Sequence, residues 1–221
     1  MPNQKEHLVA PLPTIRRMPA YLRILRAALA SEAKVVSGAH IARELQLEPI
    51  QVRKDFGFLG VTGKPRIGYE AQPLAEAIET LLGWDNTNDA FLIGAGRLGT
   101  ALIGYEGFRR HGLEIVAAFD SDPSHAGKEI NNVKILPMDT MIDLARRMHV
   151  HIAVLTVPAA VAQEVTNMLV QAGIMGIWNF SPVKLTVPKN VVLQDEDLSR
   201  GLAELSVRVD SMLHSQDVPP S

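Results

Sequence analysis

The chain has 221 residues, a formal net charge of −2 and no cysteine. This length allows one large domain or two small ones, and the lack of cysteine excludes disulfides, zinc sites built on thiolates and thiol-based redox sensing. The charge is uneven, because residues 1–66 hold 11 Lys and Arg against 5 Asp and Glu, whereas residues 67–221 hold 11 against 19. A basic segment ahead of an acidic one indicates that the first part meets a polyanion, although an ordinary solvated basic surface would have the same composition.

The sequence gives no sign of a membrane span. Its longest uncharged stretch, residues 165–183, includes Asn, Gln, Thr, Ser and Pro, which are costly in a lipid environment. We therefore expect a cytoplasmic protein with no membrane partner.

Residues 1–13 are polar and rich in proline, which predicts disorder. The segment that follows is a predicted helix, because its apolar residues recur at spacings of three and four. These residues are Ile15, Met18, Leu22, Leu25 and Leu29. Pro19 lies inside the pattern, and we expect the regular helix to begin there.

Two shorter helices are predicted next. Ser37 is a typical N-cap for a helix that runs through Leu45, and Pro49 suits the first position of a third helix. This third helix is expected to turn Ile50, Val52 and Phe56 inward and to present Gln51, Arg53 and Lys54 outward. Two helices across a tight turn make a helix-turn-helix, in which the second helix reads DNA.

A hairpin is predicted at residues 60–69, where glycines and a proline cluster and where Lys64 and Arg66 would lie at the tip. Three helices and a basic hairpin make a winged helix, which we assign to residues 1–85 with a linking helix at 73–82. Base contacts are expected from the third helix, and phosphate or minor-groove contacts from the hairpin. The expected DNA-binding residues are Ser37, Gln51, Arg53, Lys54, Lys64 and Arg66. Asp55 is expected to pair with a neighbouring cation instead, because phosphate repels a carboxylate.

A dinucleotide site is predicted from residues 91–120. An apolar run ends in Gly94-Ala95-Gly96-Arg97-Leu98-Gly99, and a second apolar run ends in Asp120. In such βαβ units the first glycine permits a tight turn, the second lets the backbone approach a pyrophosphate, and the third lets the helix pack on the strand. Asp120 would accept hydrogen bonds from both adenosine ribose hydroxyls and repel a 2′-phosphate, so NAD(H) is favoured over NADP(H). A glycine turn that serves packing alone is the alternative.

Strands and helices alternate beyond Asp120, which predicts a doubly wound parallel sheet of the Rossmann type over residues 86–195. Strands are expected at 133–136, 151–156, 175–179 and 191–193, and helices at 140–148 and 159–171. Ligands bind at the carboxyl ends of such strands. Besides the glycine loop and Asp120, the residues expected there are Thr156, Val157, Pro158, Asn179, Phe180 and Ser181.

The last segment, residues 196–221, contains one predicted helix with a heptad-like apolar stripe. The stripe consists of Leu198, Leu202, Leu205, Val209 and Met212. Such a stripe packs either on its own domain or against a partner subunit, and the pattern is compatible with both.

A nicotinamide-dependent dehydrogenase is one alternative for this fold. Such an enzyme needs a proton donor or acceptor beside the reacting carbon, and the residues expected at the nicotinamide end include no good acid or base at neutral pH. We therefore expect a regulator without catalytic residues and without a metal site. A CoA-binding or other nucleotide-binding regulator is the second alternative, motivated by Arg97, although Asp120 disfavours an adenosine with a 3′-phosphate.

Over residues 13–210 the chain resembles the Rex redox-sensing transcriptional repressors of bacteria. The resemblance rests on the order and spacing of several segments. In the first part these are Pro13-Thr-Ile-Arg-Arg17, Tyr21-Leu-Arg-Ile-Leu25, Gln51-Val-Arg-Lys-Asp55 and Gly63-Lys64 with Gly68-Tyr69. In the second part they are Gly94 to Gly99 with Tyr105, Phe119-Asp-Ser-Asp-Pro123, Val157-Pro158 and Asn179-Phe180 with Pro182-Val183.

The resemblance implies a homodimer that binds NAD(H) in its Rossmann domains and a pseudo-palindromic operator through paired winged helices. It implies that the C-terminal helix is exchanged between protomers, that NADH releases DNA and that NAD⁺ permits binding. It also implies that Tyr105 of one protomer and Asp197 of the other meet the nicotinamide, with Arg23 as a competing partner of Asp197.

Four features depart from the usual family pattern. Arg97 stands in place of Asn in the glycine loop, and Pro65-Arg66 removes a glycine from the hairpin. Phe56-Gly57-Phe58 lacks a hydroxyl found in the family, and Glu48 replaces a Ser or Thr cap. The departures in the first part are expected to change the affinity for DNA or the operator sequence that is recognised. Arg97 is expected to affect which ligand is bound.

Overall fold

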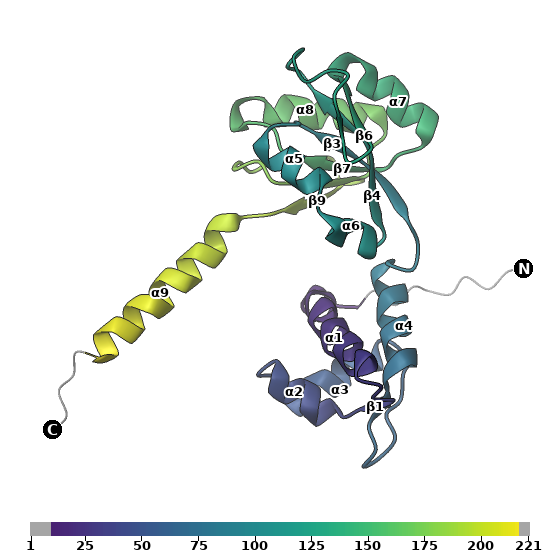
Figure 1. The fold of residues 1–221 in the computed structure, drawn as a ribbon, viewed down its shortest axis with the longest axis vertical. Helices are drawn as coiled ribbons and strands as arrows, with labels where there is room; N and C mark the ends of the chain where they lie inside the picture. Colours follow the sequence, from purple (N-terminus) through teal and green to yellow (C-terminus); the bar gives the residue numbers. More distant parts are fainter. Residues whose placement is uncertain (1–9, 217–221) are drawn as a thin grey trace, which may run out of the picture. The chain divides into compact units, whose positions relative to one another are not determined.

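The computed structural model describes residues 10–216 of the chain. These residues form two compact units, one made of residues 10–87 with Arg110–Gly112 and the other of residues 88–109 with 113–216. The two units have separate hydrophobic cores. Figure 1 shows the elements of each.

The first unit combines helices with a small antiparallel sheet. Its elements are α1 (Leu12–Ala30), β1 (Val35–Val36), α2 (Gly38–Glu44), α3 (Pro49–Gly57), β2 (Tyr69–Glu70) and α4 (Ala71–Leu82). The predicted winged helix-turn-helix is therefore present, and α4 is the predicted linking helix.

Helix α1 begins earlier than predicted. It starts at Leu12 and continues through Pro19 to Ala30. The expected disorder of residues 10–13 and the expected start at Pro19 are therefore wrong, whereas residues 1–9 lie outside the described residues. Pro13 is tolerated in the first turn, where an amide has no helical partner, and Pro19 removes one hydrogen bond that the packing of α1 offsets.

An aromatic stack forms the centre of the first core. The Phe56 ring lies between Tyr21 and Tyr69, with ring centroids 5.1 and 5.0 Å away and edge-to-face orientations. Tyr21 and Phe56 are fully buried. Because edge-to-face pairs add to the free energy of burial, this stack fixes α3 against α1 and β2.

Helix α3 differs from its prediction at one position. Val52 and Phe56 are fully buried as expected, but Ile50 is 59% exposed. The buried stripe of α3 is Val52, Asp55 and Phe56, and Ile50 lies about 200° around the helix from Val52. The inward assignment of Ile50 is therefore wrong.

The wing is a tight turn on a minimal sheet. Strand β2 pairs with β1, with Val36 opposite Tyr69, and not with the residues that precede the turn along the chain. The turn itself is closed by reciprocal backbone hydrogen bonds between Lys64 and Gly68, 2.8 and 2.9 Å long. Arg66 adopts a positive φ of 63° at its tip, so the two cations lie at the turn as predicted.

The second unit is an α/β sandwich. Its strands are β3 (Asn88–Ile93), β4 (Leu113–Asp120), β5 (Glu129–Ile130), β6 (Val133–Pro137), β7 (Ile152–Leu155), β8 (Gly176–Asn179) and β9 (Val192–Asp195). Its helical segments are α5 (Arg97–Ile103), α6 (Glu106–Arg110), η1 (Met138–Thr140), α7 (Met141–Met148), α8 (Ala159–Ala172) and α9 (Leu198–Gln216).

The sheet has the order β5-β6-β4-β3-β7-β8-β9. Six strands are parallel, and only the short β5 runs antiparallel, beside β6. Without β5, this is the order of a Rossmann fold, which confirms the predicted class. The chain order reverses on either side of β3, so the loop after β3 lies at the topological switch point where such sheets bind ligands.

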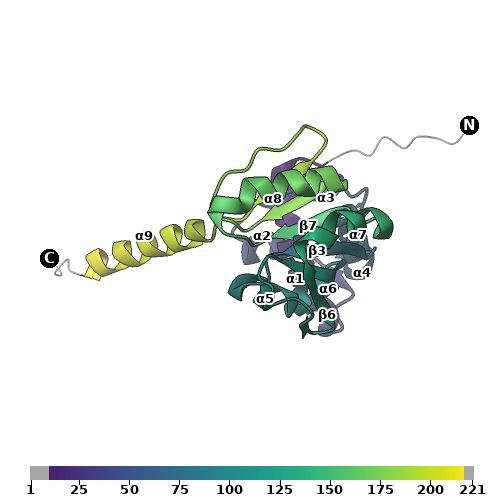
Figure 2. The ribbon, with the colours of Figure 1, turned by 90° about the horizontal axis from the view of Figure 1, so that it is seen from above.

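Helices cover both faces of the sheet (Figure 2). On one face α7 and α8 pack over Phe91 and Phe119, and on the other α5 and α6 pack over Leu92 and Ala118. Phe91 and Leu92 point to opposite faces because side chains alternate along a strand. Each face thus has its own apolar cluster. Polar residues for ligand binding are therefore to be sought at the ends of the strands.

Helix α9 packs on nothing within the described chain. The side chains of its stripe are exposed by 46–65%, at Leu202, Leu205, Val209 and Met212. Packing on its own domain, one of the two expected arrangements, is therefore not what the structure shows. Among the described residues no helix is both long and apolar enough to cross a membrane.

Candidate functional site

The three glycines of the loop between β3 and α5 have distinct roles. Gly94 has a φ of +97°, a conformation that other residues rarely adopt. A Cβ on Gly99 would overlap the Gly94 carbonyl oxygen, whereas a Cβ on Gly96 would meet nothing within 4 Å. The first and third glycines are thus required by the fold, and the second leaves open space for a ligand.

Thr156, at the end of β7, braces this loop. Its Oγ1 lies 2.6 Å from the Gly94 carbonyl oxygen and 3.0 Å from that of Ile93, and its amide donates to Ile93. The hydroxyl is therefore engaged by the loop backbone. We assign Thr156 to positioning the loop, and its expected contact with a cofactor stays a prediction.

Asp120 ends β4 beside the same loop. Its Oδ2 accepts a hydrogen bond from the Ala95 amide at 2.7 Å, and its Oδ1 accepts one from the Asp122 amide at 2.8 Å. A carboxylate has about four lone-pair positions, so Asp120 can still accept hydrogen bonds from a ribose. His125 Nδ1 lies 3.2 Å from Asp120 Oδ2.

A groove of about 690 Å³ opens at this edge of the sheet. This volume lies within the range of small-molecule sites. Its polar wall includes Gly94, Gly96, Asp120, Asp122 and His125, and its apolar wall includes Leu98, Met138, Val157, Val161, Val165, Met168 and Phe180. A polar rim around the glycine loop and an apolar slot beside it suit the phosphates and the flat ring of a nucleotide.

Asn179 and Ser181 line a second hollow of about 700 Å³, which shares Phe180 with the groove. Asn179 is buried and donates to the Val183 carbonyl at 3.0 Å and to Asp195 at 2.8 Å, while its oxygen accepts from the Ser181 amide. Ser181 Oγ donates to the Val157 carbonyl. Both side chains are committed within the chain, so their expected contact with a cofactor stays a prediction, and Phe180 between them lines the groove.

Pro158 lines the groove where α8 begins. Arg97, by contrast, occupies the exposed first position of α5 and is absent from the groove wall within the described chain. Both remain predicted cofactor residues.

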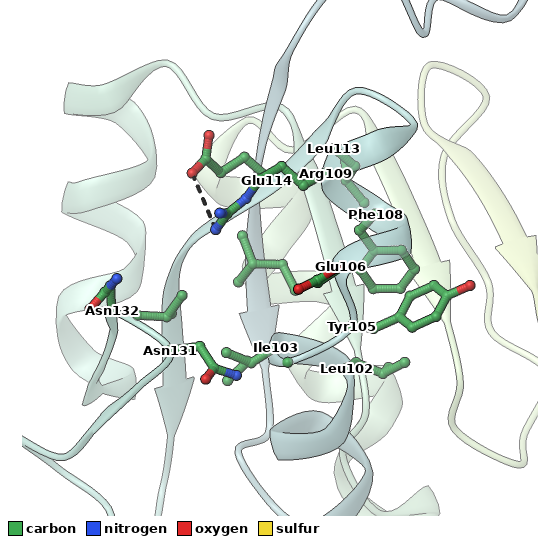
Figure 3. A pocket seen from close by; sticks show the side chains of 13 residues that line it. Leu102, Ile103, Tyr105, Glu106, Phe108, Arg109, Leu113, Glu114, Asn131 and Asn132 are labelled. Carbon is green, nitrogen blue, oxygen red and sulfur yellow. Dashed lines mark ion pairs between the residues drawn. The ribbon is translucent and has the colours of Figure 1, made fainter. Parts of the chain in front are cut away.

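Tyr105 and Asp197 do not line this groove, and Asp197 lines the second hollow together with Asn179 and Ser181. Tyr105 is 57% exposed and packs edge-to-face on Phe108 at 5.2 Å. Figure 3 shows this pair at a smaller hollow of about 260 Å³, opposite an ion pair between Arg109 and Glu114. Asp197 accepts hydrogen bonds from the Ser199 hydroxyl and amide, which hold the pKa of its carboxyl below the ordinary value. Their predicted meeting at a nicotinamide involves two protomers and stays a prediction.

Three of the predicted DNA-binding residues of the first unit lie on α3. Arg53 and Lys54 are exposed as predicted, and Ser37 caps α2 by accepting from the His40 amide at 3.1 Å. Gln51 is only half exposed, because its amide donates to Asp55 at 3.0 Å. At the wing, Lys64 pairs with Glu70 at 2.7 Å, and Arg66 is exposed.

Asp55 is the buried centre of a hydrogen-bond network. Its carboxylate accepts from Arg17, Tyr21, Thr14 and Gln51 at 2.6–3.0 Å. Burial by itself would raise the pKa of Asp55, but these hydrogen bonds outweigh burial and lower the pKa. The predicted pairing with a cation is confirmed, but the expectation of a local partner is wrong, because the cation is Arg17 of α1, 38 residues away along the chain. Arg17 and Tyr21 had not been expected to have this role.

Within the described residues no three His, Asp or Glu side chains gather into a possible metal site.

Two family models match the chain. The model for a CoA binding domain covers residues 85–183, and a model described as "Putative DNA-binding protein N-terminus" covers residues 10–57. The two matches fall on the glycine-loop unit and on the helix-turn-helix.

Similar proteins match nearly the whole chain. The redox-sensing transcriptional repressor Rex of Treponema denticola is 50% identical over 199 residues, which cover 90% of this chain and 95% of that protein. Rex of Bacteroides thetaiotaomicron is 38% identical over 200 residues, covering 90% and 91%.

Solved structures of a Rex-family repressor also match nearly the whole chain. RSP, described as a Rex-family repressor, superposes with a TM-score of 0.87 at 30% identity, covering 95% of this chain and 98% of that one. RSP in complex with β-NAD⁺ and operator DNA has a TM-score of 0.87 at 31% identity, covering 95% and 97%. RSP in complex with β-NADH has a TM-score of 0.86 at 31% identity, covering 96% and 99%.

Proposed function

The chain belongs to the Rex family of redox-sensing transcriptional repressors, and we propose that it binds a pseudo-palindromic operator as a cytoplasmic homodimer and leaves the DNA when NADH binds. The observation that carries this proposal is one chain with two sites, a basic helix α3 in a winged helix and a nucleotide groove built on a glycine loop and Asp120. The crystallised complexes of RSP, one with NAD⁺ and operator DNA and one with NADH, support it. We assign DNA binding to residues 1–85, NAD(H) binding to 86–195 and dimer formation to 196–221.

The ribose site favours NAD(H) over the alternatives. Asp120 faces the groove with free acceptor capacity, which suits two ribose hydroxyls and disfavours a phosphate on either. CoA carries a 3′-phosphate on this ribose, and Asp120 disfavours that phosphate. A CoA-binding regulator of the same fold is therefore the second candidate and not the first.

The switch requires two states with different affinities for the two cofactor forms. NAD⁺ and NADH differ by one positive charge and by ring planarity at the nicotinamide, so the discriminating groups belong there. We propose that Tyr105 and the partner protomer's copy of Asp197 are these groups, with Arg23 as the competing cation. Linkage then requires that DNA and NADH weaken each other's binding equally.

A function as a dehydrogenase does not agree with the similar proteins, because these are named as repressors. This agrees with the expected lack of an acid or base at the nicotinamide end. The bound cofactor is then a signal and not a reactant.

The exposed stripe of α9 supports a dimer held by this helix. Leu205→Glu places a charge on the stripe, where Leu205 is 60% exposed in the single chain. We expect this variant to be monomeric in light scattering at concentrations where the unmodified protein is a dimer, because a buried unpaired charge is costly. Val207→Glu is the matched control, since Val207 lies about 200° around the helix from Leu205. A dimeric Leu205→Glu variant would contradict dimer formation through the stripe.

The decisive experiment measures operator binding with each ligand. An operator is selected with this protein from random DNA, and fluorescence anisotropy follows the complex with NAD⁺, NADH, NADPH or CoA. We expect NADH to dissociate the complex and NAD⁺ to leave it intact. Tight CoA binding without NADH binding would favour the second candidate, and a complex indifferent to NADH would overturn the proposal.

A further inference from the structure

His125 faces Asp120, the carboxylate that we expect to bind the ribose, in the wall of the nucleotide groove. His125 Nδ1 lies 3.2 Å from Asp120 Oδ2, the same oxygen that accepts from the Ala95 amide. This Nδ1 is buried, and nothing in the described chain makes a hydrogen bond of good geometry to it. Since buried polar atoms are normally satisfied, the nearest partner for this atom is the Asp120 carboxylate, with which it can share a proton.

The loop after β4 sets the position of this ring through its backbone. The Asp122 amide donates to Asp120, the Ser124 amide donates to the Asp122 carboxylate, and the His125 amide donates to the Asp122 carbonyl. These successive turns fold the loop back toward Asp120. The side chain of His125 can therefore be changed without removing a contact that the loop needs.

The charged groups around the imidazole come from three parts of the unit. Asp120 ends β4, Asp122 and Lys128 belong to the loop, and Glu164 of α8 lines the same groove. Hydrogen bonds from Ser124 mainly, with the charges of His125 and Lys128, lower the pKa of Asp122. The groove wall thus carries three carboxylates, Asp120, Asp122 and Glu164, and the Lys128 ammonium acts on Asp122, so the charge of one imidazole changes the local balance substantially.

We propose that His125 sets the discrimination between NADH and NADPH and makes it depend on pH. With a neutral imidazole, the charge of Asp120 repels a 2′-phosphate. With an imidazolium, the Nδ1–H faces Asp120 and offsets that charge, so NADPH is rejected less. Histidine is the side chain that ordinarily changes charge between pH 5 and 8. The inference rests on the proposed function, because it concerns the ribose end of the NAD(H) site.

The test compares the dissociation constants of NADH and NADPH by calorimetry at pH 8 and pH 6. The second ionisation of the 2′-phosphate falls in the same range, so the unmodified protein is compared with His125→Gln. We expect the Kd ratio of NADPH to NADH to fall on acidification by about tenfold more in the unmodified protein than in this variant. His151→Gln should match the unmodified protein, because His151 precedes β7 at the opposite end of that strand.

A second variant tests the same point with a permanent charge. At pH 8, where the 2′-phosphate has the same charge in both samples, His125→Lys should show a lower ratio than the unmodified protein. Equal pH dependence of the ratio in the unmodified protein and in His125→Gln would overturn the inference while NADH still binds. A lack of NADH binding to the unmodified protein at both pH values would instead overturn the proposed function.

Discussion

Replacement of Arg53 by alanine is expected to abolish specific operator binding and to leave NADH affinity unchanged. Arg53 lies on the exposed face of α3, where its one hydrogen bond within the described chain is a long one of 3.4 Å to the Pro49 carbonyl. Its guanidinium is thus available for a bidentate contact with a guanine edge, worth about 1–3 kcal/mol of base discrimination. A dimer has two copies, so the expected loss is about 2–6 kcal/mol.

Fluorescence anisotropy on the selected operator measures this loss, and NADH titration of the same sample checks that the groove is intact. Arg26→Ala is the matched control, because it removes the same charge from an exposed arginine that pairs with Glu79. We expect this control to lose little affinity. Unchanged operator affinity in Arg53→Ala would show that α3 is not the recognition helix.

The sequence was sufficient for features that depend on local chemistry. The strands of the sheet were predictable because apolar runs end at turn residues, and the glycine loop because a Cβ on Gly99 cannot fit. Asp120 was predictable because it directly follows an apolar strand. The acceptor role of Ser37 followed from the ordinary preference of helix N-termini.

Other features depend on contacts between distant segments. Pro19 suggested a helix start, but Thr14, Arg17 and Tyr21 all bond Asp55 from one face of a helix that must begin earlier. Ile50 points outward because the burial of Asp55 turns the inner face of α3 away from Ile50. An apolar spacing pattern carries no information on which polar residue will be buried.

The same limit applies to the groove. Asn179 and Ser181 are predicted to contact the cofactor because they lie at a strand end. The sequence did not show that their side chains also bond Asp195 and Val157, which lie 16 and 24 residues away. The position of His125 against Asp120 was likewise visible only once the loop was folded.

Replacement of Asp55 by alanine is expected to destabilise the winged-helix unit by about 3–5 kcal/mol, as breaking a buried ion pair does. Asp55 is fully buried, and Arg17 and Tyr21 would lose their shared acceptor. Urea unfolding followed by circular dichroism should show an early transition for this unit. The second unit has its own core and is expected to retain NADH binding in native buffer.

The stability of the same unit should depend on pH through this carboxyl. Its pKa is lowered in the folded protein, so its contribution is fully present above the unfolded pKa of about 3.9 and is lost as the pH falls through the folded value. We expect the urea midpoint of the winged-helix unit to fall from pH 5 downward. Asp55→Asn should be less stable at pH 7 but should lack this part of the acid loss, because its amide cannot be protonated in that range.

Glu44→Gln provides the matched control for the pH series. Glu44 is an exposed residue of α2 in the same unit, and neutralising it should leave the acid-dependent loss in place. If Asp55→Asn instead loses stability below pH 5 as steeply as the unmodified protein, other carboxylates cause the loss. A stability at pH 7 equal to that of the unmodified protein would show that Arg17 and Tyr21 need no negative partner to hold α1 against α3.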